Sequence, residues 1–361
     1  MSRRLKRLGI GAAIGLVVVM IAAAAPITTI EIGCGRGAVV APTPAAADIP
    51  DPGYRRAEGD SYLTYPEWYI VHAYADLAGV TRQSSESSYD YGASIATFWR
   101  SLCRTTAAAR AIGPVTADQR ITDYIIGLSF TLEMGVQGLY ERTIGAATVW
   151  TRGDQKTAED AFNQRFLDDY AAFLQQTPWY RYPFKTELAR FWRETPWSFQ
   201  SPIRSAERRF ALSLEYAAKG LYAVAIGALA GVSPADLTIM TIVRGPHAGD
   251  VPDVTVVRDL GGGNMLVRTP RYQAYTEILE AWAKNGTSVV EIAGNRRILA
   301  TVIAREGVRV EAPGLTPIFT IPIQSRPGFE RTGFDADIPA LTQAIEAIGR
   351  QGATFEHAYD Y

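Results

Sequence analysis

The sequence predicts an α+β protein in which an N-terminal transmembrane helix precedes an α-helical domain and then a ferredoxin-like α/β sandwich domain. Three observations lead to this prediction. An apolar run extends from Leu8 to Ile30, apolar residues recur at helical spacing over residues 61–245, and short β-branched runs fill residues 250–361. Such periodicities distinguish helices from strands. Helices first and strands afterwards are typical of α+β proteins.

The N-terminal segment has the composition of a membrane anchor. Residues 1–7 form a basic tip with four cationic side chains, and the 23 residues of Leu8–Ile30 carry no charge. At about 1.5 Å per residue, a helix of this length covers the roughly 30 Å hydrocarbon core of a bilayer. Cationic flanks favour the cytoplasmic side. We therefore expect a single pass through the inner membrane of a bacterial envelope, with a cytoplasmic N-terminus and a periplasmic bulk.

Other interpretations of the apolar segments remain open at this point. The run also fits a signal peptide cleaved near Ala24. Cys34 suggests a lipoprotein, although Glu31, three residues earlier, does not fit the processing pattern. The apolar stretch Gly220–Val232 is too short for a second crossing and is typical of a buried or shallowly inserted helix.

Composition excludes some functions and leaves others open. The chain has 361 residues, 47% of them apolar, and a net charge of −1, without a basic stripe. These features argue against a nucleic-acid partner. Cys34 and Cys103 match neither a disulfide framework nor a metal spacing, so we expect two unpaired thiols. The three histidines are widely separated, and the sequence predicts no metal and no cofactor.

The middle of the chain is a linker followed by helices. Residues 31–60 are rich in Pro and Ala, which predicts a semi-extended spacer. Thr64 and Glu67 have the spacing of a capping box at the start of the first helix. Six helices are predicted in the domain 61–245: Pro66–Leu77, Ala93–Ile112, Ala117 to about Ala147, Thr157–Gln176, Phe184–Glu194 and Ser205–Gly231.

The last part, residues 250–361, alternates strands with two helices. Tyr272–Lys284 and Ile338–Arg350 have helical periodicity, and Gly294-Asn295 predicts a hairpin turn. Each helix lies between β-branched runs, so the pattern contains two strand–helix–strand units. We therefore expect one ferredoxin-like sandwich.

An internal repeat links two of the predicted helices. Residues 131–146 and 213–228 are identical at eight of sixteen positions, including Leu132-Glu133 and Leu214-Glu215. Small residues recur in both copies where another helix could approach closely. The repeat predicts two similar helices that form a central pair.

The repeated glutamates are the first candidate site. Glu133 and Glu215 lie in apolar stretches, where an unpaired charge would cost several kcal/mol. A structural interpretation pairs Glu215 with Lys219, and Glu133 with Gln137 or Arg142. A functional interpretation makes the two carboxylates an acid/base or cation site. With His72 they form the set of catalytic candidates, Glu133, Glu215 and His72.

Aromatic residues beside prolines are the second candidate site. Trp68, Tyr69, Trp179 and Trp197 follow or adjoin such prolines. Packing at helix corners is one explanation. A pocket for an apolar ligand, such as a lipid or a quinone, is the other.

Function is predicted mainly from position and missing motifs. The sequence contains no G-x-S-x-G, and none of the histidines offers Ser61 a matching acid partner. We expect a membrane-anchored envelope protein without catalytic activity that binds a protein partner in the envelope. The alternatives are an apolar-ligand binding protein and an enzyme that uses Glu133, Glu215 and His72.

Overall fold

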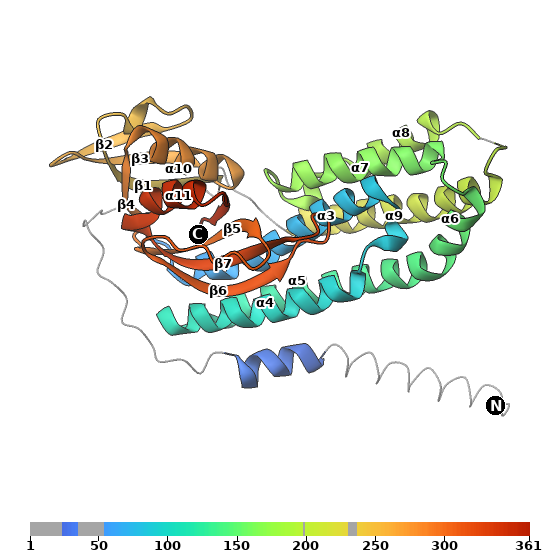
Figure 1. The fold of residues 1–361 in the computed structure, drawn as a ribbon, viewed down its shortest axis with the longest axis horizontal. Helices are drawn as coiled ribbons and strands as arrows, with labels where there is room; N and C mark the ends of the chain where they lie inside the picture. Colours follow the sequence, from blue (N-terminus) through green and yellow to red (C-terminus); the bar gives the residue numbers. More distant parts are fainter. Residues whose placement is uncertain (1–23, 35–53, 198, 230–236) are drawn as a thin grey trace.

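The protein, described here by a computed structural model, is defined over residues 24–34, 54–197, 199–229 and 237–361 (Figure 1). The α+β prediction is confirmed, because a helical part precedes antiparallel sheets. We call residues 60–229 the helical domain and residues 237–361 the sheet domain. Helices of the first are α2 (Asp60–Leu63), α3 (Tyr65–Gln83), α4 (Tyr91–Ile112), α5 (Ala117–Tyr140), α6 (Ala146–Arg152), α7 (Ala158–Leu174), α8 (Phe184–Glu194) and α9 (Pro202–Leu229). Each of the six predicted helices has a counterpart among them.

Side-chain caps explain where several of these helices begin. Asp90 accepts a hydrogen bond from the Ala93 amide at the start of α4, and Thr157 forms a capping box with Asp160 at the start of α7. The capping box predicted at Thr64 is not formed. Its hydroxyl donates to the Asp60 carbonyl, because α2 leads directly into α3.

The sheet domain holds two four-stranded antiparallel sheets, so the prediction of a single ferredoxin-like sandwich is wrong. Their strand orders are β2-β3-β1-β4 and β6-β7-β5-β8, and each sheet is built from a β-β-β-α-β unit of the same topology. The strands are β1 (Thr238–Arg244), β2 (Thr255–Gly261), β3 (Asn264–Pro270), β4 (Ser288–Ile292), β5 (Arg297–Arg305), β6 (Leu315–Pro322), β7 (Phe329–Asp337) and β8 (Thr354–Tyr359). Strand β1 lies within the stretch predicted to be helical, up to residue 245. Eight strands are too many for one four-stranded sheet.

The two sheets and the helical domain form successive layers. Helices α10 (Gln273–Asn285) and α11 (Leu341–Arg350) lie between the sheets (Figure 1). Along β5, Ala300 packs in this sheet-domain core, while the neighbouring Leu299 packs in the core of the helical domain. Because side chains of a strand alternate between faces, the β5–β8 sheet is covered on both sides. The helical domain is therefore docked directly on this sheet.

The start of the chain is fastened to the helical domain. Residues 24–33 are helical, and Glu31 accepts hydrogen bonds from Arg110, Arg120 and Tyr124. Leu8 to Ala23 of the predicted anchor lie outside the described residues, and no helix within the described part is long and apolar enough to cross a membrane.

The prediction of two unpaired thiols is wrong. Cys34 and Cys103 form a disulfide, with their Cα atoms 5.4 Å apart. The two residues are separated by 69 positions in the sequence. No local spacing motif could therefore reveal the bond, which depends on how the first helix lies against α4.

The end of the predicted linker is packed rather than free. Residues 35–53 are not described, but the Tyr54 hydroxyl donates to Glu291 at 2.6 Å. Glu58 accepts from the backbone amides of Arg296 and Arg297 at 3.1 and 2.8 Å. Residues 54–60 therefore run along the sheet domain, because they supply partners for its strand ends and hairpin.

Candidate functional site

The helical domain carries an exposed apolar surface on α5 and α9. We call this surface the apolar face and define it by eight exposed residues, which are Ile125, Leu132, Val136, Leu139, Phe210, Leu214, Leu221 and Val224. Leu132, Leu139 and Leu221 are 68%, 71% and 75% exposed. Soluble monomers rarely expose so many large apolar side chains along neighbouring turns of a helix without a function.

Charged side chains are nearly absent from this part of both helices. Between Tyr124 and Tyr140 the only charged residue is Glu133, and between Phe210 and Leu229 only Glu215 and Lys219 occur. All three are only partly exposed and pair with one another. The outward surface of the two helices therefore carries no free charge in these stretches.

The internal repeat explains why the two stripes face the same way. Glu133 contacts Lys219, and further along α5 Tyr140 donates to Glu207, so α5 and α9 run antiparallel. In each copy the glutamate points toward the other helix, and the leucine just before it lies about 100° away around the axis of its own helix. In an antiparallel pair, this equal offset places both leucine stripes on one side. The prediction that the two helices pack as a central pair is wrong, because α5 packs mainly on α4 and α9 on α8, and only long side chains join α5 to α9.

The repeated glutamates converge on one lysine. The Lys219 ammonium lies 3.0 Å from Glu133 and 3.0 Å from Glu215, and it donates to the Tyr74 hydroxyl at 2.6 Å. Although burial lowers the pKa of Lys219, the nearby carboxylates and Tyr74 raise it well above its usual range. The lysine therefore stays charged. The predicted Glu215–Lys219 pair is confirmed, and the predicted Glu133 partners are wrong, because Arg142 pairs with Asp90.

His72 lies on a different side of α3 from this ion cluster. Tyr74, two residues on, faces Lys219, whereas the His72 Nε2 lies 3.0 Å from the Tyr359 hydroxyl on β8. Residues two apart on a helix point in nearly opposite directions. The three catalytic candidates Glu133, Glu215 and His72 therefore do not form one site.

His72 belongs to a buried polar cluster between α3 and the β5–β8 sheet. Arg331 donates two hydrogen bonds to Glu356, at 2.5 and 2.7 Å, and the Glu356 carboxylate lies 3.8 Å from His72 Nδ1. Burial and the Arg331 charge lower the pKa of His72 to about 3. The His72 imidazole is therefore neutral near pH 7. The cluster joins the two domains and contains no histidine that titrates near neutral pH.

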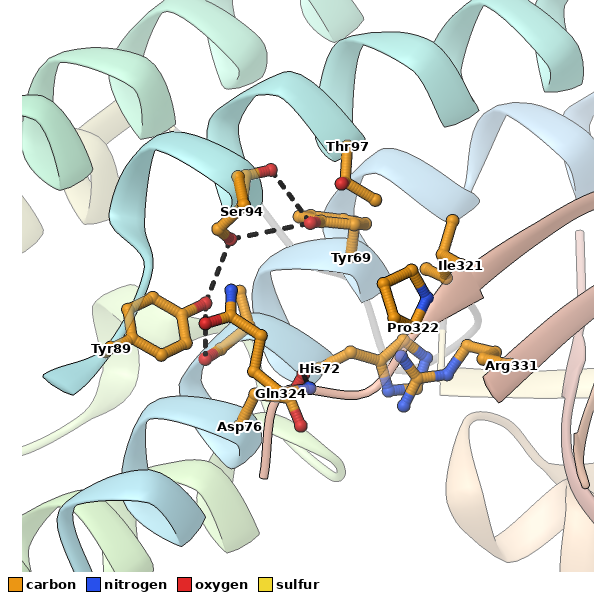
Figure 2. A pocket seen from close by; sticks show the side chains of 12 residues that line it. Tyr69, His72, Asp76, Tyr89, Ser94, Thr97, Ile321, Pro322, Gln324 and Arg331 are labelled. Carbon is orange, nitrogen blue, oxygen red and sulfur yellow. Dashed lines mark hydrogen bonds between the residues drawn. The ribbon is translucent and has the colours of Figure 1, made fainter. Parts of the chain in front are cut away.

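A small cavity lies beside this cluster (Figure 2). Its walls come from α3, α4, the end of β6 and β7, and include Tyr69, Asp76, Ser94 and Arg331. The Tyr69 hydroxyl donates to the Ser94 carbonyl at 2.8 Å. The cavity volume is about 40 Å³, which is enough for a few water molecules and too small for an organic ligand.

The four aromatic candidates lie in separate places. Trp68 is buried against His357, with ring centres 3.6 Å apart, and Tyr69 faces the small cavity. Trp179 packs on Tyr222 of α9, and Trp197 is 43% exposed beyond the end of α8. They do not line a common pocket.

A buried arginine cluster escaped the sequence interpretation. Arg204 and Arg208 of α9 are fully buried, and they bind Glu86, Asp160 and Glu141 from three other elements. The charged residues among positions 204–209, at the start of an otherwise apolar helix, could have indicated this buried ion cluster. Glu141 begins a short π-helical segment, and burial together with Glu86 raises its pKa to about 7 against the lowering effect of Arg208. The cluster ties α9 to α7 and to the segments that contain Glu86 and Glu141.

Comparison with known proteins adds no assignment, since no family model, curated protein or solved structure matches this chain. Within the described ranges, no group of His, Cys, Asp and Glu side chains could hold a metal ion. The apolar face is therefore the feature with the clearest functional meaning.

Proposed function

We propose that this chain is a non-catalytic envelope protein, anchored in the inner membrane through Leu8–Ile30, whose apolar face docks on a membrane-embedded protein partner. The N-terminus lies in the cytoplasm and the folded part lies on the periplasmic side. The observation that carries the proposal is the apolar face, because its eight large side chains are exposed and uncharged over several turns of two helices. Burying each leucine would contribute about 1.5–3 kcal/mol.

The attachment of the first helix supports this placement. Ile30, at the end of the proposed anchor, is buried in the core of the helical domain, and Glu31 and the Cys34–Cys103 disulfide fasten the chain there to α4 and α5. The helical domain is thus held close to the membrane. One of the two helices that carry the apolar face, α5, is also contacted by the residues at the end of the anchor. Stable disulfides are also typical of oxidising compartments such as the periplasm.

The geometry of the candidate groups supports a non-catalytic role. Glu133 and Glu215 both pair with Lys219, and His72 is enclosed in the domain interface. General acid–base catalysis needs such groups to reach one substrate atom. These three do not share a cleft.

Crosslinking in cells tests the partner. A photo-reactive amino acid is placed at Leu132 or at Leu221 of the full chain, and crosslinked products are identified by mass spectrometry. We expect the same membrane protein from both positions, and none from the exposed Val257 of β2, which serves as the control. Crosslinks that are absent, or equal at all three positions, would contradict the proposal.

Reporter fusions test the topology independently. Fusions after residue 60 and at the C-terminus should both report a periplasmic location. A cytoplasmic C-terminus would overturn the proposed orientation, whatever the crosslinking result.

A further inference from the structure

A groove runs along α9 beside the segment that precedes and begins α8. One wall is the segment from Tyr180 to Thr186, and the other is a row on α9 made of Gly220, Ala223, Val224 and Gly227. The groove volume is about 490 Å³, within the range of ordinary small-molecule sites. It is thus far larger than the cavity beside His72.

The row on α9 is apolar, whereas the opposite wall carries Arg181, Lys185 and Thr186 beside its aromatic rings. A Cβ added at Gly227 would lie 3.8 Å from the Tyr180 ring, and one added at Gly220 would lie 3.4 Å from the Phe184 Cβ. At these two glycines the gap between α9 and the opposite wall is therefore about as wide as one methyl group. The floor has no charged side chain from α9.

Cationic side chains border this apolar channel. Arg181 and Lys185 both line the groove and are both exposed, and neither makes an ion pair within the described part of the chain. Trp179 packs against Tyr222 next to them, with ring centres 5.0 Å apart. Aromatic and cationic side chains at the edge of an apolar surface are typical of the headgroup region of a membrane.

We propose that the groove binds one acyl chain of an anionic phospholipid, whose phosphate is held by Arg181 and Lys185. The charge complementarity selects a phospholipid over a neutral apolar ligand. Val224 belongs to both the groove and the apolar face, so the site lies at the border of that face. The inference rests on the membrane placement in the proposed function, since only there would phospholipid meet the groove.

Lipid binding by the purified full chain tests the inference. The protein is delipidated in dodecyl maltoside, and native mass spectrometry measures binding of added phosphatidylglycerol and phosphatidylcholine. We expect phosphatidylglycerol to bind more tightly. The double variant Arg181→Gln/Lys185→Gln should bind it about tenfold more weakly, because two charge-assisted contacts to the phosphate are lost. The control Lys284→Gln/Arg350→Gln removes two exposed cations elsewhere and should bind as the unchanged protein does.

A second pair of variants tests the acyl chain. Gly227→Leu fills the groove and should weaken binding of long-chain phosphatidylglycerol, whereas Gly227→Ala adds one methyl group at ordinary contact distance and should have little effect. Glycerol phosphate, which carries the phosphate without acyl chains, should not compete at equal concentration.

Two results would overturn the inference. Equal binding of both lipids by the unchanged protein is one, and full competition by glycerol phosphate is the other. Partner crosslinking at Leu132 together with absent lipid binding would remove this inference and leave the proposed function standing.

Discussion

The two sides of the helical domain differ in whether their side chains have partners. The side docked on the β5–β8 sheet is buried, and its apolar core encloses a polar cluster in which His72, Arg331 and Glu356 all contact partners. The outer side, on α5 and α9, is apolar and exposed. Buried charges normally need partners, and large exposed apolar patches normally mark a binding site. The difference indicates that the inner side is complete and that the outer side is made for apolar surroundings.

The largest expected effect comes from breaking the inner side. Arg331→Met leaves the Glu356 carboxylate buried without its main partner and should cost about 3–5 kcal/mol of unfolding free energy. Chemical denaturation followed by circular dichroism measures this loss. Adding Glu356→Gln to the first change should restore much of it, because no charge is then left unpaired. An unchanged midpoint for Arg331→Met would show that the inner side is not a complete ion cluster.

The disulfide gives the next largest effect. Cys103→Ser should cost about 2–4 kcal/mol, since it removes a link between distant parts of the chain. Limited proteolysis should then cut near residues 24–34 sooner than in the unchanged protein. Equal cleavage rates in the variant and the unchanged protein would contradict the account. They would show that the disulfide does not hold residues 24–34 against the helical domain.

The pH dependence of stability tests the inner side through titration. His72 has a pKa of about 3 in the folded chain because of burial and the Arg331 charge, against 6.5 unfolded, so the unfolded chain gains a proton first as the pH falls. Arg331 lowers the pKa of Glu356 from 4.5 to about 2 although burial raises it, so its contribution is present above 4.5 and is lost as the pH falls toward 2. The contribution of His72 and Glu356 should therefore decrease from pH 6.5 downward, whereas Glu141, whose pKa is raised to about 7 chiefly by burial, contributes in the opposite direction. Thermal melts of His72→Gln should show a smaller decrease between pH 6.5 and 4; the same decrease would contradict this assignment.

The smallest expected effect on folding comes from the outer side. Leu132→Gln or Leu221→Gln should change the unfolding free energy by less than about 0.5 kcal/mol in detergent, since both side chains are already exposed. The same changes should reduce recovery of the crosslinked partner. A large loss of stability would indicate that these residues pack within the chain.

Local sequence patterns predicted the features that depend on neighbouring residues. Helical periodicity predicted α4 and α8, and a spacing of four residues predicted the Glu215–Lys219 pair. Features that depend on distant residues were missed. The Cys34–Cys103 bond and the contact of Glu133 with Lys219 each join parts far apart in the sequence. The second sheet was missed because two consecutive β-β-β-α-β units were assigned to one sheet. The repeat also contained a functional signal that the sequence interpretation missed, because its exposed leucines belong to the apolar face.

The most direct test of the central claim is the solvent accessibility of the apolar face in native membranes. Hydroxyl-radical footprinting compares Leu132 and Leu221 with the exposed Val257 control, first in membrane vesicles and then in detergent-purified protein that has lost its partner. We predict that oxidation of both leucines in vesicles is strongly reduced relative to Val257. Oxidation of the leucines in vesicles at the same rate as Val257 would contradict the claim that the apolar face is covered in the envelope.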